Sequence, residues 1–534
     1  MSVPSAVPLG ARVRQVAEWA FYSPRAYANP FADVDVEGVL TDPAGVTYQM
    51  PAFYDGQGIW RLRFSPSIPG DWQLSLRSSP HDPALCWEGR LQVGACEARG
   101  LLRAVPGTAW GLAWENGEPA LVIGDTTYNL FGMAHCGLDV KAFMQRRVQQ
   151  GINLLRVRVP VSPFHPPEGY SAWQERRTWP WGGSEQAPQF DRFNLDYFHT
   201  VDAVVQEAER LGLGLEMIME AWGFEFPFSQ RQLFVPEWEQ LWMRYLVARY
   251  DAYSAVAIWT LMNEYEFYPD GDWRHNPAAD RWALRMGRWL KGIAPHGHIV
   301  ALHNGPELPP FAQRLQRDPE AIDLILYQSW GTRDAARGWL AAEIEDRLQA
   351  SLEGWGGASL LAEWGYERNE RFPLLIPSHA HCDGEHTRRG AWRGLFMARG
   401  IIHGFENSWG PFADLEHDQQ GLAYLLVARR FFNERVPFAH LQPAPELLAP
   451  LSQCPGGYRP LALATPARDI ILVYLPAGGE VCLPLPGSDI RAAWFSPVDG
   501  SERPAVGSEG SFRAPSVSFA GHPQDWILII EERR

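Results

Sequence analysis

The spacing of hydrophobic positions changes twice along the chain and divides it into three segments. In the first segment apolar and polar residues alternate, as in VDVEGVL (34–40) and IWRLRF (59–64), and turn-forming stretches such as DPAG and SIPGDW separate the runs. Alternation with a period of two is typical of strands that bury one face. We therefore expect residues 1–100 to form a small N-terminal β-sandwich.

The second segment, residues 101–440, alternates near-continuous apolar runs with amphipathic stretches of helical period. Apolar strands separated by helices indicate a parallel sheet that is buried on both faces. Eight such units predict a closed (β/α)₈ barrel, because a doubly wound sheet seldom contains as many. The predicted strands are 120–125, 152–159, 213–219, 255–262, 298–303, 322–328, 358–364 and 401–409, and the predicted helices include 138–150, 195–211, 236–250 and 278–293.

The third segment starts in the proline-rich stretch VPFAHLQPAPELLAP and returns to alternation, for example in DIILVYLP (469–476) and IRAAWFSP (490–497). Residues 441–534 are therefore expected to form a C-terminal β-sandwich. The predicted fold class is α/β: a (β/α)₈ TIM barrel flanked by N-terminal and C-terminal β-sandwich domains.

Composition narrows the range of binding partners. The chain has 47 basic and 62 acidic residues, a formal net charge of −15, and such a surface repels nucleic-acid phosphates and anionic lipids. It has 24 tryptophans; most are expected in cores, but indole rings also stack well on sugars. We expect a neutral carbohydrate substrate and neither nucleic-acid nor membrane binding. The oligomeric state stays open, and a homo-oligomer is one of the alternatives.

Three features of the sequence bear on localisation. No uninterrupted apolar stretch approaches the roughly 18 residues of a membrane-spanning helix. The start of the chain, MSVPSAVPLGARVRQ, lacks the basic and apolar pattern of a signal peptide. The six cysteines form no CxxC pair. These features predict a reduced, cytoplasmic protein, and a secreted protein trimmed of its signal is the alternative.

Polar residues follow the predicted strands at the end where a barrel enzyme forms its active site. A retaining glycosidase needs one carboxylic acid that donates a proton and one ionised carboxylate that attacks, about 5–5.5 Å apart. Glu264, which follows Asn263 in TLMNEYE, and Glu363, in LLAEWGY, end the fourth and seventh strands and suit these tasks. For any single glutamate, a solvated loop or helix-cap position is the more common role. Other polar or aromatic residues at strand ends are Asp125, Arg156, Glu220, Trp222, His303, Asn304, Gln328, Trp330, Glu406, Asn407 and Trp409.

The two glutamate motifs also carry a family resemblance. WTLMNE (259–264) and LLAEWG (360–365) are similar to motifs of clan A glycoside hydrolases, a superfamily of retaining barrel enzymes. The resemblance implies that Glu264 is the general acid/base and Glu363 the nucleophile. GINLLRV resembles the arginine motif of strand two, which implies that Arg156 supports the nucleophile's charge. Trp409 corresponds to the tryptophan that forms the floor of the −1 subsite.

Further motifs narrow and extend this resemblance. GDTTYNLF (124–131) resembles the apiosidase-like branch of these hydrolases, in which Asp125 would contact the terminal sugar. The flanking segments resemble an uncharacterised N-terminal sandwich domain and a short C-terminal sandwich domain that are fused to such barrels. Strand six departs from the pattern, because many relatives carry there a His or Tyr that contacts the nucleophile. YQSWGT offers Tyr327, Gln328 and Trp330 instead.

These observations predict a retaining glycoside hydrolase that removes a terminal sugar from a small oligosaccharide or glycoside. The alternative is a carbohydrate-binding or scaffold protein on a barrel that has lost catalysis. No cofactor is expected. The stretch from His379 to His386 is rich in potential zinc ligands, but its spacing fits no closed structural site, so a substrate-binding or structural loop is favoured. The predicted substrate-binding residues are Asp125, Arg156, Trp222, Asn263, Gln328, Trp330, Glu406 and Trp409.

Overall fold

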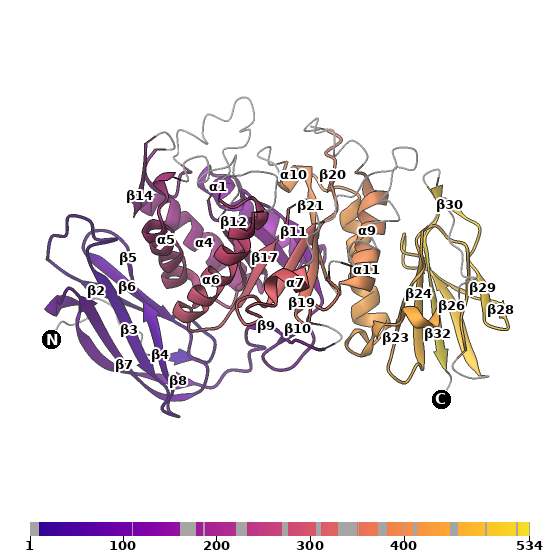
Figure 1. The fold of residues 1–534 in the computed structure, drawn as a ribbon, viewed down its shortest axis with the longest axis horizontal. Coiled ribbons are helices and arrows are strands. Elements are labelled where there is room, and N and C mark those ends of the chain that lie inside the picture. The colour runs from indigo at the N-terminus through magenta and orange to yellow at the C-terminus, as the bar shows by residue number, and fades with distance from the viewer. Residues whose placement is uncertain are drawn as a thin grey trace.

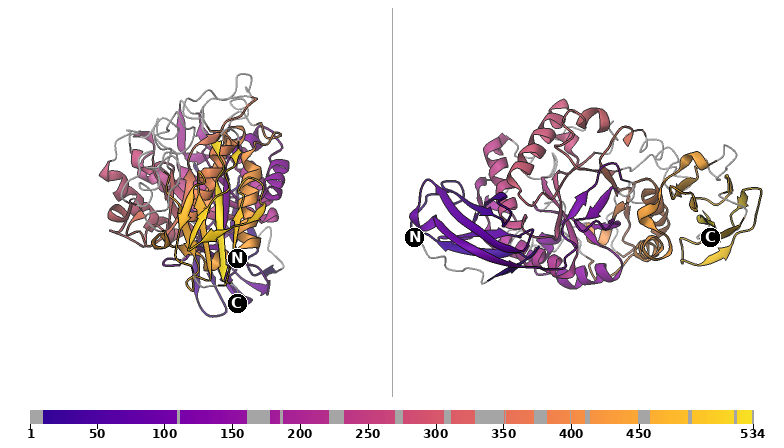
Figure 2. Two further views of the ribbon diagram at one scale, coloured as in Figure 1. Left: turned by 90° about the vertical axis from the view of Figure 1, so that its right-hand side faces the viewer. Right: turned by 90° about the horizontal axis from the view of Figure 1, so that it is seen from below.

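A central barrel with a β-rich region at either end makes up the computed structural model. The three regions lie in a row (Figure 1), and the right-hand view of Figure 2 shows the same order. In the ranges below, no helix is long and apolar enough to cross a membrane. The structure describes residues 10–108, 111–160, 178–184, 187–220, 232–269, 276–305, 311–328, 350, 352–371, 382–398, 400–409, 414–448, 458–485, 489–519 and 522–532.

The N-terminal region consists of two sheets around an apolar core. Its strands are β1 (Ala11–Arg12), β2 (Ala17–Tyr22), β3 (Asp35–Thr41), β4 (Thr47–Pro51), β5 (Phe53–Tyr54), β6 (Ile59–Phe64), β7 (Gly70–Ser79) and β8 (Trp87–Gly94). One sheet has the order β1-β8-β7-β3-β4 and the other the order β2-β6-β5. Alternate side chains, such as those of Trp19, Leu62 and Trp72, are buried in the core, as the period-two pattern predicts.

Eight parallel strands form the closed central barrel, which confirms the predicted fold class. They are β11 (Val122–Thr126), β12 (Leu154–Arg158), β15 (Gly214–Glu220), β16 (Val256–Met262), β17 (Ile299–His303), β18 (Leu324–Gln328), β19 (Ala358–Glu363) and β21 (Gly400–Phe405). Each strand pairs with the next in this order, and β11 also pairs with β21, so the ring is closed.

Helices surround the barrel and alternate with its strands. The described helices of this region are α1 (Leu130–His135), α2 (Val140–Gln149), α4 (Leu195–Leu211), α5 (Pro236–Tyr250), α6 (Pro277–Ile293), α7 (Phe311–Leu315), α9 (Gly384–Met397), α10 (Glu406–Trp409) and α11 (Gly421–Arg430). The boundaries of α4 and α5 are those predicted. Gly212 ends α4 in the left-handed conformation, which glycine adopts at little steric cost.

The eighth predicted strand, 401–409, extends too far. In the structure β21 ends at Phe405, opposite Glu367 of the short strand β20 (Tyr366–Glu367). Beyond Phe405 the strand pairing with β20 stops, and the chain turns into the short helix α10. Glu406 therefore lies in a helical turn.

The two faces of the barrel strands have different surroundings. Leu154, Leu326 and other residues of one face fill the barrel interior together with Leu102 and Leu112. These last two belong to the hairpin β9 (Leu102–Ala104)–β10 (Leu112–Trp114), which lies at the N-terminal end of the strands (Figure 1). Residues of the other face, such as Ile123, join the core between strands and helices. The hairpin covers the N-terminal end of the barrel. The C-terminal ends of the strands are therefore the place for an active site.

A buried ion-pair cluster, here called the interface cluster, joins the N-terminal region to the barrel. It consists of Asp55 and Arg63 from the hairpin β5–β6, Asp202 of α4 and Arg249 of α5. Arg63 donates to Asp202 at 2.9 Å, and Arg249 donates to both oxygens of the same carboxylate at 3.0 and 2.8 Å. Asp55 lies 3.0 Å from Arg249. Burial alone would raise the pKa of Asp202, but Arg249 and Arg63 lower it to about 2.

The C-terminal region forms two larger sheets, ordered β22-β23-β24-β32-β26-β27 and β25-β29-β28, and a two-stranded sheet of β30 and β31. Arg388 of α9 binds Asp525 at 2.8 Å, and the Tyr474 hydroxyl donates to the same carboxylate at 3.1 Å. The strands are β22 (Gln442–Pro443), β23 (Leu461–Ala464), β24 (Ile470–Leu475), β25 (Glu480–Cys482), β26 (Ile490–Phe495), β27 (Glu502–Pro504), β28 (Gly507–Ser508), β29 (Ser511–Arg513), β30 (Ser518–Phe519), β31 (His522–Pro523) and β32 (Trp526–Glu532).

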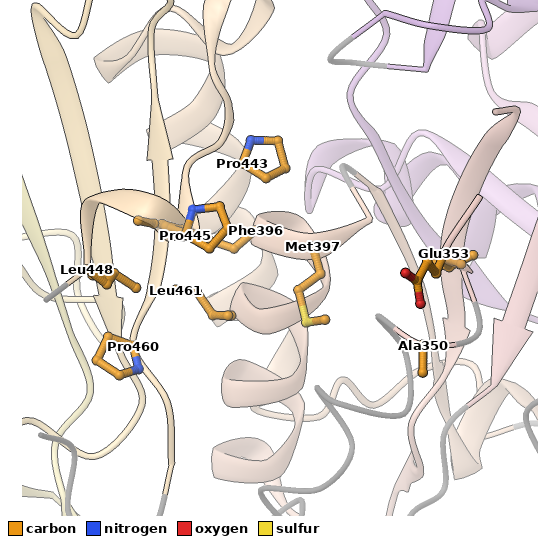
Figure 3. Close-up of a pocket in the computed structure, with 11 residues that line it drawn as sticks. Ala350, Glu353, Phe396, Met397, Pro443, Pro445, Leu448, Pro460 and Leu461 are labelled. Carbon is orange, nitrogen blue, oxygen red and sulfur yellow. The ribbon is translucent and has the colours of Figure 1, made fainter. Parts of the chain in front are cut away.

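A cavity of about 550 Å³ lies between the barrel and the C-terminal region (Figure 3). Its lining is mainly apolar and includes Phe396, Met397, Leu448 and Leu461, with Glu353 as the one carboxylate among its described residues. Glu353 precedes β19 and Met397 precedes β21, so the cavity lies near the N-terminal ends of these strands. It is remote from the end where the polar strand residues gather.

Candidate active site

Glu363 ends β19 and is held by two hydrogen-bond donors. Nη1 of Arg156, on β12, lies 2.5 Å from its Oε1, and the Tyr128 hydroxyl donates to the same oxygen at 2.6 Å. Burial alone would raise the pKa of Glu363, but Arg156 and the Tyr128 hydrogen bond lower it to about 2. The Glu363 carboxylate is therefore ionised at neutral pH.

A single guanidinium links the ends of the fourth and seventh strands. Arg156 is completely buried; its Nη2 donates to Oδ1 of Asn263, and its Nη1 donates to Glu363. The two amino groups of a planar guanidinium are adjacent, so the Asn263 and Glu363 side chains must lie close together. Because Glu264 follows Asn263 directly, the structure brings the predicted residues of β12, β16 and β19 to one place.

Glu264 follows β16 in a left-handed backbone conformation, with φ 55° and ψ 55°. This region is sparsely populated by residues other than glycine. Here it turns the chain from β16 into the short 3₁₀ helix Tyr265–Phe267. The side chain is nearly buried, with 8% of the residue exposed.

Gln328, the last residue of β18, holds the Glu264 side chain. Its Nε2 donates one hydrogen bond to Oε1 of Glu264 and another, of 2.9 Å, to the Asn304 carbonyl. The Gln328 backbone N–H donates to the Asn304 side chain at 2.8 Å. Both hydrogens of the Gln328 amide are thus used, which fixes the orientation in which it meets Glu264.

Tyr128 was not among the predicted site residues. It follows β11, and its hydroxyl, besides donating to Glu363, lies 3.4 Å from the Tyr366 hydroxyl. The Arg158 guanidinium lies 3.9 Å from the centroid of the Tyr128 ring. Tyr128 is therefore a second hydrogen-bond donor to Glu363, beside Arg156. The only sequence signal for it was its place within GDTTYNLF.

The barrel interior next to Arg156 is polar as well. Glu216, in the middle of β15, is completely buried; its Oε1 lies 3.3 Å from Nε of Arg156 and accepts a 2.8 Å hydrogen bond from Thr260. Burial raises the pKa of Glu216, although Arg156 opposes the shift. His303 lies 3.6 Å from Glu363, and burial together with Arg156 lowers its pKa, so the imidazole is neutral. Glu216 was not predicted, because it lies within the apolar run LGLEMIM.

Comparison with known families identifies the family of the barrel. Residues 111–421, more than half of the chain, match the family described as the apiosidase-like catalytic domain. The chain belongs to the apiosidase-like family. In this apiosidase-like chain, residues 12–79 also match a domain of unknown function, and residues 456–531 match a candidate collagen-binding domain of a collagenase. No match is found among the curated proteins.

Solved structures share the architecture of the apiosidase-like chain. A candidate glycoside hydrolase from Bacteroides vulgatus ATCC 8482 matches with a TM-score of 0.70 at 15% identity, over 98% of this chain and all of that one. A glycoside hydrolase of family 5 from the same organism matches with a TM-score of 0.59 at 18% identity, over 81% of this chain and 93% of that one. The apiosidase-like chain therefore has a glycoside hydrolase fold.

Asp125 lies on the face of β11 that also carries Ile123, which packs against the helices. Its buried carboxylate accepts a 2.7 Å hydrogen bond from Arg147 of α2 and a 3.3 Å bond from Ser408 of α10. Burial raises the pKa of Asp125 to about 6, although Arg147 opposes the shift. These contacts favour a structural ion pair within the helix layer. A sugar contact through Asp125 stays an untested prediction.

The other predicted residues lie at the edge of the described structure. Glu406 begins α10 and accepts a 2.8 Å hydrogen bond from the Asn369 backbone, which links α10 to the segment after β20. Within the described ranges, no group of three His, Cys, Asp or Glu side chains could hold a metal ion. Of Trp409 the structure describes only the backbone; outside the described residues lie Trp222, Trp330, His379 and His381.

Proposed function

We propose that this chain is a retaining glycoside hydrolase that removes a terminal sugar from a small oligosaccharide or glycoside by double displacement. Glu363 is the nucleophile and Glu264 the general acid/base. The observation that carries the proposal is the Glu363 carboxylate, which accepts hydrogen bonds from Arg156 and Tyr128 and is joined through Arg156 to the Asn263–Glu264 pair. One ionised carboxylate near one carboxylic acid is what the double displacement requires.

In the first half of the reaction, Glu363 attacks the anomeric carbon while the bond from that carbon to the leaving oxygen breaks. Glu264 transfers its proton to the leaving oxygen as this bond breaks. Gln328 donates to Oε1 of Glu264, so the proton to be transferred is carried on Oε2. The products of this step are a glycosyl ester of Glu363, the free aglycone and an ionised Glu264.

In the second half, water attacks the anomeric carbon of the glycosyl ester. The Glu264 carboxylate takes a proton from this water, and the bond between the sugar and Glu363 breaks. Arg156 and Tyr128 donate hydrogen bonds to Glu363, so they stabilise the carboxylate that leaves. The released sugar keeps the anomeric configuration of the substrate, and both glutamates return to their starting protonation states.

The restriction to a terminal sugar rests on the sequence. The long stretch HPPEGYSAWQERRTWPWGGS after β12 is expected to close one side of the site, and most of it lies outside the described residues. Product lengths from a soluble polysaccharide test this restriction. Release of monosaccharide alone agrees with exo action, whereas oligosaccharides of intermediate length from the start would replace it by endo action.

The test is hydrolysis of a panel of aryl glycosides, pyranosides and furanosides of both anomers, by the wild type, Glu363→Gln and Glu320→Gln. Glu320 is a surface glutamate whose side chain is 75% exposed, so the control makes the same chemical change away from the site. We expect one glycoside to be cleaved by the wild type and the control, and a loss of about 10⁴-fold or more in kcat/KM for Glu363→Gln.

The stereochemistry of the first product completes this test. Proton NMR of the reaction should show that the released sugar first carries the substrate's anomeric configuration. An inverted first product would exclude the double displacement, and undiminished hydrolysis by Glu363→Gln would exclude the assigned nucleophile. Sugar binding without any hydrolysis across the panel would favour the scaffold alternative.

A further inference from the structure

Arg156 is shared by two carboxylates, and only one of them is needed to attack a substrate. Glu363 binds its Nη1 at 2.5 Å, and Glu216 lies 3.3 Å from its Nε. Arg156 and Glu216 are register partners on the neighbouring strands β12 and β15, so their side chains leave the sheet on the same face. All three side chains are buried, and Arg156 makes ion pairs with these two carboxylates in the described part of the chain.

We infer that Glu216 is a positioning residue for the reaction: it is the permanent counter-charge of Arg156 and thereby sets how strongly Arg156 holds Glu363. This inference rests on the proposed function. Glu216 meets no substrate atom and exchanges no group with it. Its effect on the reaction passes through the guanidinium that it shares with Glu363.

The contacts of Glu216 are those of a charge-balancing group. Its Oε1 accepts a hydrogen bond from Thr260, and its Oε2 has no hydrogen-bond partner among the described residues. A buried carboxylate with an unsatisfied oxygen destabilises a fold unless a nearby charge compensates it. Arg156 supplies that charge, and in return Glu216 neutralises part of the guanidinium.

The double displacement makes this balance necessary. When Glu363 forms the glycosyl ester it loses its negative charge, and Arg156 would become a buried cation with no counter-charge. Glu216 keeps the guanidinium compensated during this intermediate. Before the attack, the sharing of Arg156 between two carboxylates weakens its hold on Glu363, which makes Glu363 a better nucleophile.

The same arrangement predicts how activity depends on pH. Burial raises the pKa of Glu216 while the pKa of Glu363 is lowered to about 2, so Glu216 is protonated first as the pH falls. In the described part of the chain, the other charged or titratable groups around the two carboxylates include Arg156 and Arg158 on β12, His303 on β17, Tyr128 after β11 and Tyr366 on β20. The acid limb of kcat/KM should therefore follow Glu216 in the wild type.

The first test compares the kinetics of Glu216→Gln and Glu216→Asp with those of the wild type, on a glycoside that the wild type cleaves. Glutamine keeps an acceptor for Thr260 and removes the charge. We expect kcat/KM of Glu216→Gln to fall about 10- to 100-fold, its acid limb to move to lower pH, and Glu216→Asp to recover part of the loss. An unchanged acid limb would overturn the inference, whatever the size of the loss.

Glu209→Gln is the matched control. The Glu209 carboxylate is also largely enclosed and has a raised pKa, caused by burial, and it accepts hydrogen bonds from Ser254 and Ala255 at 2.8 and 2.6 Å. It lies at the end of α4, and Arg156 is not among the groups that shift its pKa. This variant should keep the wild-type acid limb. A shift equal to that of Glu216→Gln would contradict the assigned role.

The second test needs no substrate, so it separates failure of the inference from failure of the proposed function. Thermal unfolding midpoints are measured for Glu216→Gln, Glu363→Gln and the double variant at pH 7. The double variant leaves Arg156 without either carboxylate, so its midpoint should fall by more than the sum of the two single shifts. Strictly additive shifts would overturn the inference, even if no glycoside were cleaved. If Glu216→Gln does not fold, Glu216→Asp takes its place and the excess should be smaller but of the same sign.

Discussion

Two buried arginine clusters in this molecule look alike in contacts and differ in electrostatics. In the interface cluster both carboxylates respond in the same direction, because the arginines lower the pKa of Asp202 to about 2 and that of Asp55 as well, against burial. Around Arg156 the two carboxylates diverge: the pKa of Glu363 is lowered and that of Glu216 is raised. A buried ion pair alone does not indicate an active site. Two carboxylates that share one arginine but have pKa values shifted in opposite directions are a candidate for one, and here burial raises the pKa of Glu216 while Arg156 lowers that of Glu363.

After Glu363→Gln, the largest loss of activity is expected for a change at Glu264. This residue belongs to the candidate site but to neither arginine cluster. Glu264→Ala should lose about 10²- to 10⁴-fold in kcat/KM toward a glycoside with a poor leaving group. The loss should be much smaller for a dinitrophenyl glycoside, whose leaving group needs no proton. Added azide should restore turnover, because this anion attacks the glycosyl ester without help from a base and releases a glycosyl azide as the bond to Glu363 breaks. Equal losses for both leaving groups, without azide rescue, would contradict the acid/base role.

A substitution in the interface cluster should lower the stability of the protein and leave its activity nearly unchanged. Asp202→Asn leaves Arg63 and Arg249 short of a buried counter-charge, so we expect a loss of about 3–5 kcal/mol in the free energy of unfolding, measured with denaturant. The value of kcat/KM should stay within about twofold. Because the pKa of Asp202 is lowered in the folded state, this stabilisation should be present above about pH 4 and fall away toward pH 2.

Asp318→Asn is the control for this prediction. Asp318 forms its ion pair with Arg288 on the surface, where the two side chains are 24% and 49% exposed. Exposed ion pairs contribute roughly 0–1 kcal/mol, so the control should change stability little. Equal losses of stability in the two variants would show that the buried interface cluster contributes no more to stability than an exposed ion pair does.

A smaller effect is expected at Tyr128, whose hydroxyl donates to Glu363 at 2.6 Å and lies 3.4 Å from Oδ1 of Asn263. A hydrogen bond to a charged group contributes about 1.5–3 kcal/mol, so Tyr128→Phe should lose roughly 10- to 100-fold in kcat/KM. The pKa of Glu363 should rise in this variant, because a donor to its charged form is removed. Tyr22→Phe, at a residue that is 54% exposed, should behave as the wild type. Wild-type kinetics for Tyr128→Phe would show that Arg156 alone holds Glu363.

The smallest effect is expected at His298, which has a shifted pKa but lies outside the candidate site. This residue tests whether a shifted pKa alone indicates a functional residue. His298 is buried near the N-terminal end of the barrel, where its ring donates to the Asp251 carbonyl at 2.7 Å, and burial lowers its pKa to about 4. Its contribution to stability is complete above about pH 6.5 and is lost as the pH falls toward 4. In His298→Gln, calorimetry should show a smaller drop in the unfolding midpoint between pH 7 and 4.5. Loss of hydrolysis by this variant would contradict the distinction between pKa shifts that belong to the candidate site and pKa shifts that affect stability alone.

The sequence predicted the features that depend on residues close together in the chain. The helix 195–211 is found as α4 because its apolar stripe and the terminal Gly212 act over a few residues. The strand ends that carry Glu264 and Glu363 follow from the apolar runs before them. The eighth strand was drawn too long, because its end depends on pairing with β20 and not on its own residues.

Contacts between distant positions could not be predicted in this way. Arg156 and Glu363 are 207 positions apart, and Tyr128 and Glu363 are 235 apart. Glu216 is a single charged residue in an apolar run, and nothing nearby in the chain indicates that an arginine on the neighbouring strand faces it. The two catalytic candidates and the role of Arg156 beside Glu363 could be predicted from motifs, whereas Tyr128 and Glu216 could be placed only in the closed barrel.

The left-handed backbone of Glu264 has a consequence for how such a chain changes over generations. A residue with a Cβ atom loses roughly 1–2 kcal/mol in this conformation, whereas glycine adopts it freely. Glu264→Gly should therefore give a fold at least as stable as the parent, although it has no proton to donate. Folding by itself does not select for glutamate here. In a lineage released from selection for hydrolysis, this position would drift toward residues that suit the turn, and the barrel would gain stability as it lost its reaction.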